Sequence, residues 1–191
     1  MKSISAPTPG KIIILNGPSS AGKTTLALAL QKQLDIPFIR FSFDLFIEHK
    51  AFPSEQIKSA KFSWAQMRPA VFRGVHQCVP ARATAGNNII FDHIIETKAW
   101  LFELVRLIAD LDVFFVGVHC SLPELERREI QRGDRRLGEA RQDFETLYGI
   151  PTYDLEIDSE QPLDENVTRL IQAWQERKHP SALDRMIDEM N

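Results

Sequence analysis

An eight-residue pattern near the N-terminus constrains this 191-residue chain more than any other feature. Residues 17–24 read Gly-Pro-Ser-Ser-Ala-Gly-Lys-Thr, which is a complete G-x-x-x-x-G-K-[S/T] arrangement. The apolar run of residues 11–16 precedes it, and Leu26, Leu30 and Leu34 follow it with the spacing of one helix face. The pattern therefore predicts a buried strand, a glycine loop and a helix over 24–34, in that order.

Such a loop predicts a nucleoside triphosphate site. Its glycines let successive backbone N–H groups point inward, and the helix that follows adds partial positive charge. We expect Lys23 to reach the β- and γ-phosphates and the Thr24 hydroxyl to bind Mg²⁺. The candidate nucleotide ligands are Gly17, Pro18, Ser19, Ser20, Ala21, Gly22, Lys23, Thr24 and Thr25. ATP is favoured over GTP because the sequence has no N/T-K-x-D element for guanine recognition.

Apolar periodicity along the rest of the chain predicts an α/β fold with a mainly parallel sheet. Further strands are expected over 38–41, 88–91, 113–119 and 153–157, and helices over 98–109, 122–131 and 163–177. No repeat or linker divides the chain, so residues 1–191 are expected to form one domain.

Two segments do not fit the strand and helix alternation. Residues 45–87 contain Pro53, Pro69 and Pro80, which predicts an interrupted helical insertion that could shape an acceptor pocket. The tail over 178–191 is mostly polar and is expected to form a loose helix or one that binds a partner.

Charge and hydropathy exclude several classes of partner. Twenty-three basic and 26 acidic side chains give a formal net charge of −3, so no bulk positive field draws the chain to nucleic acid or to an anionic membrane. No apolar stretch is long enough for a signal sequence or a membrane span, which makes the cytoplasm the expected location. No pattern indicates an oligomeric state.

Two carboxylates follow predicted strands and are candidates for the chemistry. Asp92 ends the apolar run 89–91, at the strand end that faces the ligand crevice of an open α/β sheet, so it is a candidate Mg²⁺ ligand. Asp44 follows the second strand and is a candidate general base for an attacking hydroxyl. A turn or helix-cap role is the alternative interpretation of each.

Arginines are concentrated over 127–138, a segment with glycines at positions 133 and 138. We interpret it as a lid that could bring guanidinium groups onto the phosphates and exclude water. Arg132 and Arg135 flank a Gly-Asp pair and are the preferred lid residues. For Arg127 and Arg128 a solvated helix face, paired with neighbouring glutamates, is the preferred interpretation.

Aromatic and large apolar side chains gather between the second and third strands. Either they line an acceptor pocket or they form the core of the inserted helices. The residues are Phe46, Phe52, Phe62, Trp64, Met67 and Phe72. The five histidines have no metal-ligand spacing, and none of them is assigned a catalytic role.

Five of these blocks, taken in order, resemble the chloramphenicol phosphotransferase family. They are residues 13–24, 43–44, 86–93, 112–120 and 127–135. The resemblance spans about residues 11 to 175 and implies a P-loop kinase fold with sheet order 2-3-1-4-5. It also implies ATP with Mg²⁺ as the phosphoryl donor, a primary hydroxyl on an amphenicol-type antibiotic as the acceptor, and Asp44 as the general base.

The function expected from residues and resemblance is an ATP-dependent O-phosphotransferase acting on a small hydroxylated molecule. Chloramphenicol is a candidate acceptor, which would make the chain an antibiotic-resistance enzyme. A kinase of another acceptor, such as a nucleoside or a sugar, is one alternative. A second is an ATP-dependent switch that hydrolyses slowly and binds a protein through its tail, although no glutamine that could position water stands beside the loop.

Overall fold

A five-stranded parallel sheet forms the centre of the computed structural model, which describes residues 7–133, 137–147 and 152–190. The strands are β1 (Ile12–Asn16), β2 (Ile39–Phe41), β3 (Ile89–His93), β4 (Val113–His119) and β5 (Leu155–Asp158). Their order is β2-β3-β1-β4-β5, and each neighbouring pair is parallel. The expected fold class and strand order are therefore confirmed.

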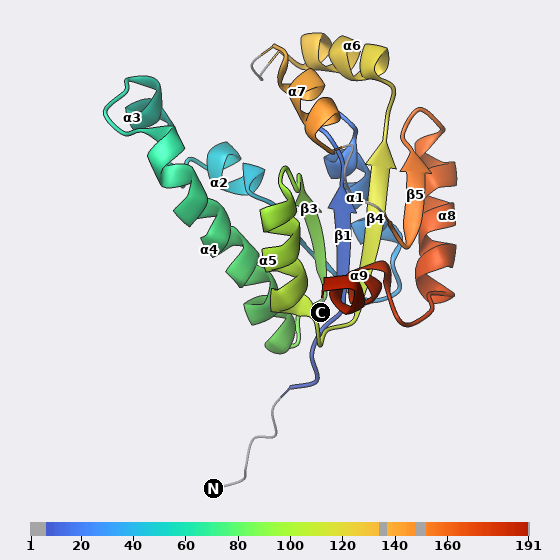
Figure 1. Ribbon diagram of the computed structural model, residues 1–191. Coiled ribbons are helices and arrows are strands. Elements are labelled where there is room, and N and C mark those ends of the chain that lie inside the picture. The colour runs from blue at the N-terminus through green and yellow to red at the C-terminus, as the bar shows by residue number, and fades with distance from the viewer. Residues whose placement is uncertain (1–6, 134–136, 148–151, 191) are drawn as a thin grey trace, which may run out of the picture.

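Helices cover both faces of the sheet (Figure 1). Helices α1 (Lys23–Gln33) and α8 (Leu163–Gln175) pack on one face. Helices α4 (Trp64–Thr84), α5 (Lys98–Ile108) and α9 (Ala182–Met190) pack on the other.

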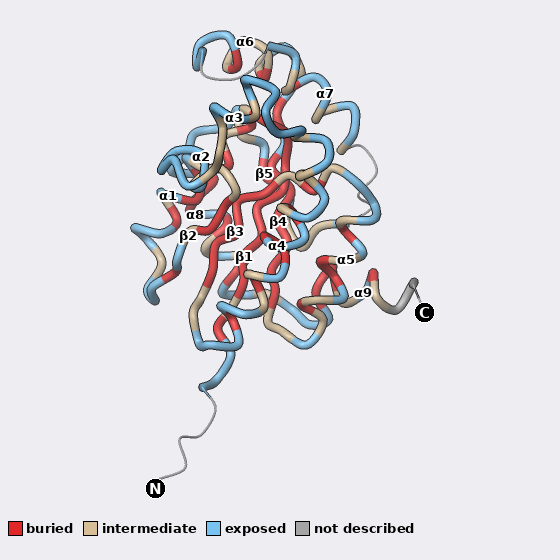
Figure 2. Tube along the Cα trace, turned by 90° about the vertical axis from the view of Figure 1, so that its left-hand side faces the viewer, coloured by how far each residue is buried: buried red, intermediate tan, exposed pale blue. Residues whose placement is uncertain are grey.

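Strand β1 lies between two hydrophobic clusters. Ile12 and Ile14 belong to the cluster under α4, α5 and α9, whereas Ile13 and Leu15 belong to the cluster under α1 and α8. Figure 2 shows the buried strands at the centre and the exposed outer sides of the helices. A strand covered on both faces needs apolar side chains at every position, which explains the unbroken run in the sequence.

The remaining helices gather beyond the carboxyl ends of the strands (Figure 1). They are α2 (Asp44–Glu48), α3 (Ser54–Lys58), α6 (Leu122–Arg132) and α7 (Glu139–Thr146). In open α/β sheets ligands bind at this edge. Helix α7 had not been predicted from the sequence, and it becomes important for the site below.

The prediction for the proline-bearing segment was partly wrong. The chain breaks between α2, α3 and α4, and Pro53 immediately precedes α3, but Pro69 and Pro80 lie inside a continuous α4. Each internal proline costs roughly 3 kcal/mol in an isolated helix. Packing of one face against the core offsets that cost, and the buried residues of this face are Phe72, Val75, His76, Val79 and Ala83.

The tail contains the expected helix, α9, but the expectation that this helix is loose was wrong. Ala182, Leu183 and Met186 of α9 are buried in the same cluster as α4 and α5. The Asp154 carboxylate accepts hydrogen bonds from the backbone N–H groups of Phe115 in β4 (2.8 Å) and Ala182 (2.6 Å). The tail is thus tied to the sheet by both apolar burial and hydrogen bonds, because its few apolar residues share one helix face.

Among the described residues, no helix combines the length and the apolar character needed to cross a membrane.

Candidate active site

The predicted loop joins β1 to α1 and curls around the lysine that follows it. The buried Lys23 ammonium donates hydrogen bonds to the carbonyl oxygens of Gly17 (2.9 Å) and Pro18 (2.8 Å). Gly17 must be a glycine because a Cβ there would lie 2.3 Å from the Val118 carbonyl oxygen. Gly22 adopts a φ of 86°, which favours glycine. The fold therefore builds a concave, positively charged cradle suited to phosphates.

A cavity of about 680 Å³ lies over this loop. Loop residues, Arg128, Arg132 and the segment between β5 and α8 line it. The Arg128 guanidinium donates to the Ser159 hydroxyl (3.1 Å) and to the Ser159 carbonyl oxygen (3.0 Å), and its Nε donates to Glu124 (2.7 Å). These bonds fix Arg128 beside the loop, so its charge faces the place where phosphates would bind.

The pair Thr24 and Asp92 is suited to a hard divalent cation. The Thr24 hydroxyl donates to Asp92 Oδ2 at 2.6 Å, and Asp92 is 7% exposed. A hydroxyl and a carboxylate are the oxygen ligands that Mg²⁺ prefers. Arg40 Nη1 lies 4.0 Å from the same carboxylate oxygen and is buried, and it makes no hydrogen bond with the described residues. The donor chemistry at this point therefore fits Mg²⁺.

A second cavity, of about 630 Å³, adjoins the first. Ser19, Asp44, Asp92 and Ile94 line both cavities, so they mark the boundary between them. Asp44 is in the first turn of α2. A carboxylate at this boundary is placed where a group would be transferred from one cavity to the other.

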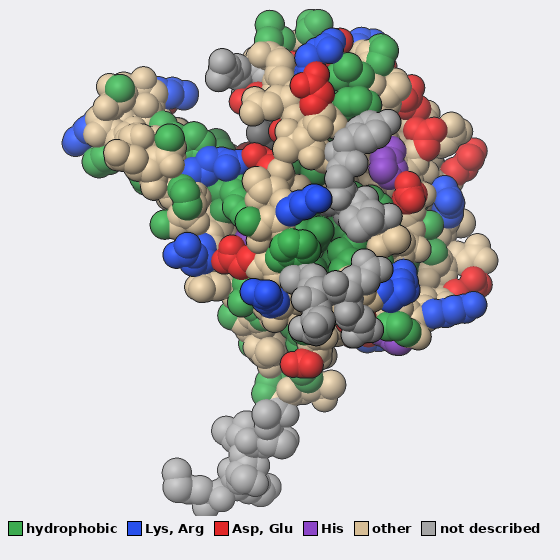
Figure 3. Space-filling view, viewed as in Figure 1, with side chains coloured by type: hydrophobic (Ala, Val, Ile, Leu, Met, Phe, Trp, Pro, Cys, Tyr) green, Lys and Arg blue, Asp and Glu red, His purple; other side chains and the backbone are tan. Residues whose placement is uncertain are grey.

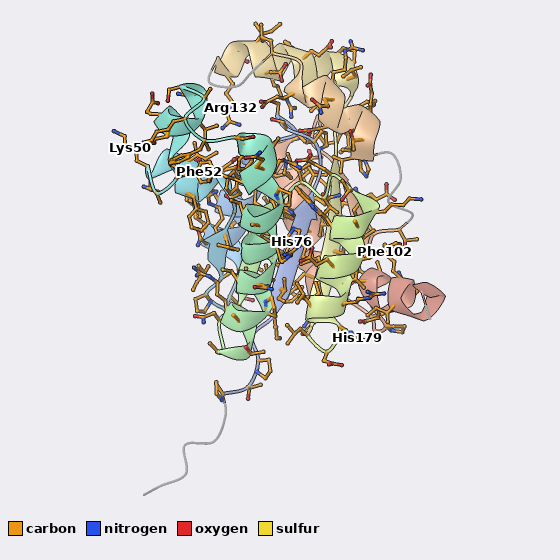
Figure 4. All side chains as sticks on the ribbon, turned by 60° about the vertical axis from the view of Figure 1, so that its left-hand side comes forward. Lys50, Phe52, His76, Phe102, Arg132 and His179 are labelled. Atoms are coloured by element: carbon orange, nitrogen blue, oxygen red, sulfur yellow. The ribbon has the colours of Figure 1, made fainter. Side chains whose placement is uncertain are left out.

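Besides Ser19, three parts of the chain line the second cavity, within residues 42–72, 92–96 and 139–143. Aromatic rings from the α2 to α4 region form one wall, with Phe43 stacked on Trp64 at 5.8 Å between ring centroids and edge-on to Phe52 at 5.3 Å. Figure 4 shows Phe52 between α2 and α3, and Arg132 at the end of α6. In the space-filling view a notch separates the α3 end of the molecule from the α6 and α7 side (Figure 3).

Charged groups also line this cavity. Arg68 forms an ion pair with Glu96, and its guanidinium lies over the ring of Trp100 (4.5 Å) and the ring of Phe72 (5.0 Å). These contacts hold Arg68 against an aromatic surface. The charge of Arg68 is therefore largely balanced by contacts within the protein.

A buried histidine pair supports the same wall. His76 Nε2 lies 2.9 Å from His93 Nε2, and both side chains are buried (Figure 4 labels His76). Burial lowers the pKa of His93 well below its usual value, and burial also lowers the pKa of His76. Because both pKa values are lowered, the two rings are neutral at neutral pH, and one ring donates the hydrogen bond that the other accepts.

Helices α6 and α7 form one unit beside both cavities. Glu129, which is 2% exposed, accepts hydrogen bonds from the backbone N–H groups of Gly138 (2.7 Å) and Ala140 (2.8 Å). Arg141 of α7 also pairs with Glu126 of α6. A carboxylate at a helix N-terminus satisfies N–H groups that the helix cannot. Glu129 therefore holds α7 against α6.

Comparison with known families identifies the chain. The family model described as "Chloramphenicol phosphotransferase-like protein" matches residues 10–175. The chain belongs to this family. Two proteins of Mycobacterium tuberculosis, from strains CDC 1551 / Oshkosh and H37Rv, are each 32% identical to it over 93% of this chain and 88% of their own length. The second is named "Putative O-phosphotransferase Rv2636".

Solved structures share the fold of this chloramphenicol phosphotransferase-like chain at low sequence identity. An APS kinase of Mycobacterium tuberculosis in complex with AMPPNP and APS has a TM-score of 0.66 and 20% identity, covering 88% of this chain and 99% of its own. A gluconokinase of Sinorhizobium meliloti 1021 has a TM-score of 0.62 and 17% identity, covering 89% and 94%. The predicted family and the general class of enzyme, a phosphotransferase of P-loop kinase type, are thereby confirmed.

In this member of the family, most of the residues singled out in the sequence come together. Lys23, Thr24, Thr25, Asp44, Asp92 and Arg132 all line the cavity over the loop. Arg135 lies outside the described residues. Of the aromatic candidates, Phe52, Trp64 and Phe72 line the second cavity, whereas Phe46, Phe62 and Met67 do not.

The two neighbouring arginines of α6 have different surroundings. Arg127 is exposed and pairs with Glu124 and Gln131, in agreement with a solvated helix face. The same interpretation was wrong for Arg128, which is three-quarters buried and faces the loop. Adjacent helix residues point about 100° apart, so only the packing of α6 decides which of the two turns inward.

Besides Arg128, sequence reasoning missed two residues near the site. They are Arg40, beside Asp92, and Asp143 of α7, which contacts the loop. A charged residue inside the short apolar run 38–41 was a usable signal for Arg40. Asp143 carried no such signal, because it lies in a segment, residues 139–146, in which most side chains are charged or polar.

Proposed function

We propose that the chain transfers the γ-phosphate of ATP to a hydroxyl group of a small molecule that binds in the second cavity. The observation that carries this proposal is the boundary between the two cavities. Asp44 and Asp92 line both cavities, with the phosphate loop on one side and an aromatic wall on the other. A phosphoryl transfer enzyme needs its donor and acceptor sites to meet at one such point.

In the proposed reaction Asp44 accepts the proton of the acceptor hydroxyl. The hydroxyl oxygen then forms a bond to the γ-phosphorus, the bond to the oxygen that bridges to the β-phosphate breaks, and ADP departs. Lys23, Arg128 and Arg132 neutralise the charge of the phosphates. Arg135 is assigned to the lid on its place in the sequence.

Thr24 and Asp92 are the residues that would hold Mg²⁺, as their oxygen donors suggest. When bound, the ion would supply charge stabilisation to the phosphate oxygens. The backbone of loop residues 17–22 would bind and orient the triphosphate, and Thr25 would lie at its margin.

The acceptor cavity favours an uncharged or cationic molecule. Five acidic residues line it, against the two basic residues Lys58 and Arg68, and Arg68 already pairs with Glu96. The five are Asp44, Asp92, Glu96, Glu139 and Asp143. Such a surplus of negative charge opposes the binding of anionic acceptors. Together with the aromatic wall, it supports an uncharged alcohol with a planar portion, and chloramphenicol is one candidate.

The experiment is a transfer assay with ATP labelled in its γ-phosphate. The acceptor panel includes chloramphenicol, other uncharged aromatic alcohols, amino alcohols, sugars and gluconate. We expect a labelled product with an uncharged or cationic alcohol and none with gluconate. Slow hydrolysis alone, with no alcohol phosphorylated, would contradict the proposal.

The Asp44→Asn variant tests the assignment of the base. We expect turnover to fall about 10²- to 10⁴-fold, because the hydroxyl proton loses its acceptor. The affinity for a non-hydrolysable ATP analogue should change less than about twofold. Asp35→Asn, which alters an exposed carboxylate outside both cavities, is the matched control. Unchanged turnover in Asp44→Asn would remove this residue from the mechanism.

A further inference from the structure

Asp143 of α7 contacts the phosphate loop directly. Its Oδ2 accepts a hydrogen bond of 2.9 Å from the backbone N–H of Ser19, which is 5% exposed. The two residues are separated by 124 positions in the chain. Loop N–H groups of this kind are the donors that cradle phosphates in a P-loop. In this structure a carboxylate of the protein therefore occupies one of them.

The position of this contact is informative. Ser19 belongs to the small set of residues that line both cavities, and Asp143 lines the acceptor cavity. The phosphate to be transferred must lie at this boundary, because it leaves the nucleotide on one side and joins the acceptor on the other. The α- and β-phosphates, in contrast, remain on the nucleotide side. Asp143 is thus close to the place of the γ-phosphate in particular.

Electrostatics point in the same direction. Burial raises the pKa of the Asp143 carboxyl, while the Ser19 N–H and the Lys23 ammonium oppose that rise. Lys23 is the residue expected to reach the β- and γ-phosphates. The carboxylate and the γ-phosphate would therefore compete for the same positive groups, and their like charges would repel each other.

We propose that Asp143 is a positioning residue. Its carboxylate occupies the place of the γ-phosphate at Ser19 and determines how tightly the site binds ATP relative to ADP. Asp143 reaches the loop from α7, which Glu129 ties to α6. A diphosphate leaves the place of the γ-phosphate empty, so only a triphosphate meets the carboxylate. The inference rests on the nucleotide site of the proposed function, but it does not depend on the identity of the acceptor.

The test compares the affinities of ADP and of a non-hydrolysable ATP analogue by titration calorimetry without acceptor. Asp143→Asn removes the charge but keeps an oxygen that can accept from Ser19. We expect the ratio of the ATP-analogue affinity to the ADP affinity to be about three- to tenfold higher in this variant than in the parent protein. Asp143→Ala should shift the ratio in the same direction, with folding checked by the thermal midpoint of each variant.

Glu145→Gln is the matched control, because it removes the same charge from an exposed position on the same helix. It should leave the ratio within about twofold of the parent. If Asp143→Asn changes both affinities equally, leaves both unchanged, or weakens the ATP analogue selectively, the inference is overturned. If neither nucleotide binds the parent protein, the proposed function fails instead, so the two failures are distinguishable.

Discussion

The two adjoining cavities are built in different ways. The floor of the cavity proposed for the nucleotide is a single stretch of chain, in which the loop and Lys23 lie within eight residues. The cavity proposed for the acceptor draws its walls from segments near residues 43–72, 92–96 and 139–143. The nucleotide floor depends on local backbone geometry, whereas the acceptor walls depend on how distant helices pack.

This difference suggests where the enzyme's chemistry and its selectivity reside. A loop specified by local geometry can be shared by many kinases, because it needs only a strand before it and a helix after it. A cavity made from packed helices can change its lining without disturbing the loop. Substitutions on the two sides should therefore act on different kinetic constants.

The largest effect is expected at the centre of the nucleotide side. Replacing Lys23 with methionine keeps the bulk of the side chain but removes its charge. We expect kcat/KM for ATP to fall about 10²- to 10³-fold. Steady-state kinetics measure the change, and Lys32→Met, at an exposed position near the end of α1, serves as the control. An equal loss in Lys32→Met would show that the effect is not local to the loop.

Substitutions of Arg127 and Arg128 test whether the packing of α6 determines which of the two arginines acts on the nucleotide. Arg128→Gln should raise the KM for ATP about tenfold or more, because a charged donor beside the loop is lost. Arg127→Gln should change it less than about twofold, because that side chain is exposed. Equal effects of the two substitutions would contradict the different environments of these arginines.

Trp64→Ala tests, from the acceptor side, whether the two cavities act separately. Removing this ring from the aromatic wall should raise the KM of the best acceptor of the panel about tenfold, with the KM for ATP unchanged. Phe62→Ala alters an exposed ring outside the cavity lining and is the matched control. A parallel rise in both KM values for Trp64→Ala would mean that the two cavities do not act separately.

The smallest effect concerns the histidine pair that supports the acceptor wall. The pKa values of His76 and His93 are lowered in the folded protein, whereas an unfolded chain titrates near 6.5. The unfolded chain therefore binds protons first as the pH falls. Stability is fully present above pH 6.5 and declines below it, by up to about 1.4 kcal/mol per histidine per pH unit until the folded pKa is reached.

Thermal midpoints measured from pH 8 to pH 5.5 check this expectation. His76→Gln should show a smaller decline than the parent protein, because one titrating group of the pair is gone. His49→Gln, at an exposed position, should decline as the parent does. Identical declines in all three proteins would exclude the pair as the cause.

Several predictions from the sequence succeeded because the relevant interactions are local or periodic. The strand before the loop was recognisable from its apolar run, and the loop from its glycines and Lys23. The place of Asp92 beside the loop was predictable because this residue closes another apolar run, and parallel strands end at one edge of a sheet. The prolines of α4 and the polar tail were misjudged, because tertiary packing outweighed local propensity at both places.

The sequence by itself determined the phosphate cradle and the order of strands and helices that surrounds it. These features follow from backbone conformation and from burial patterns that repeat along the chain. Only the tertiary structure decided that Arg128 and not Arg127 faces the loop, that Phe43 joins Phe52 and Trp64 in the acceptor wall, and that Asp143 reaches Ser19 across 124 positions. Such contacts depend on the packing of whole helices, which no short stretch of sequence records.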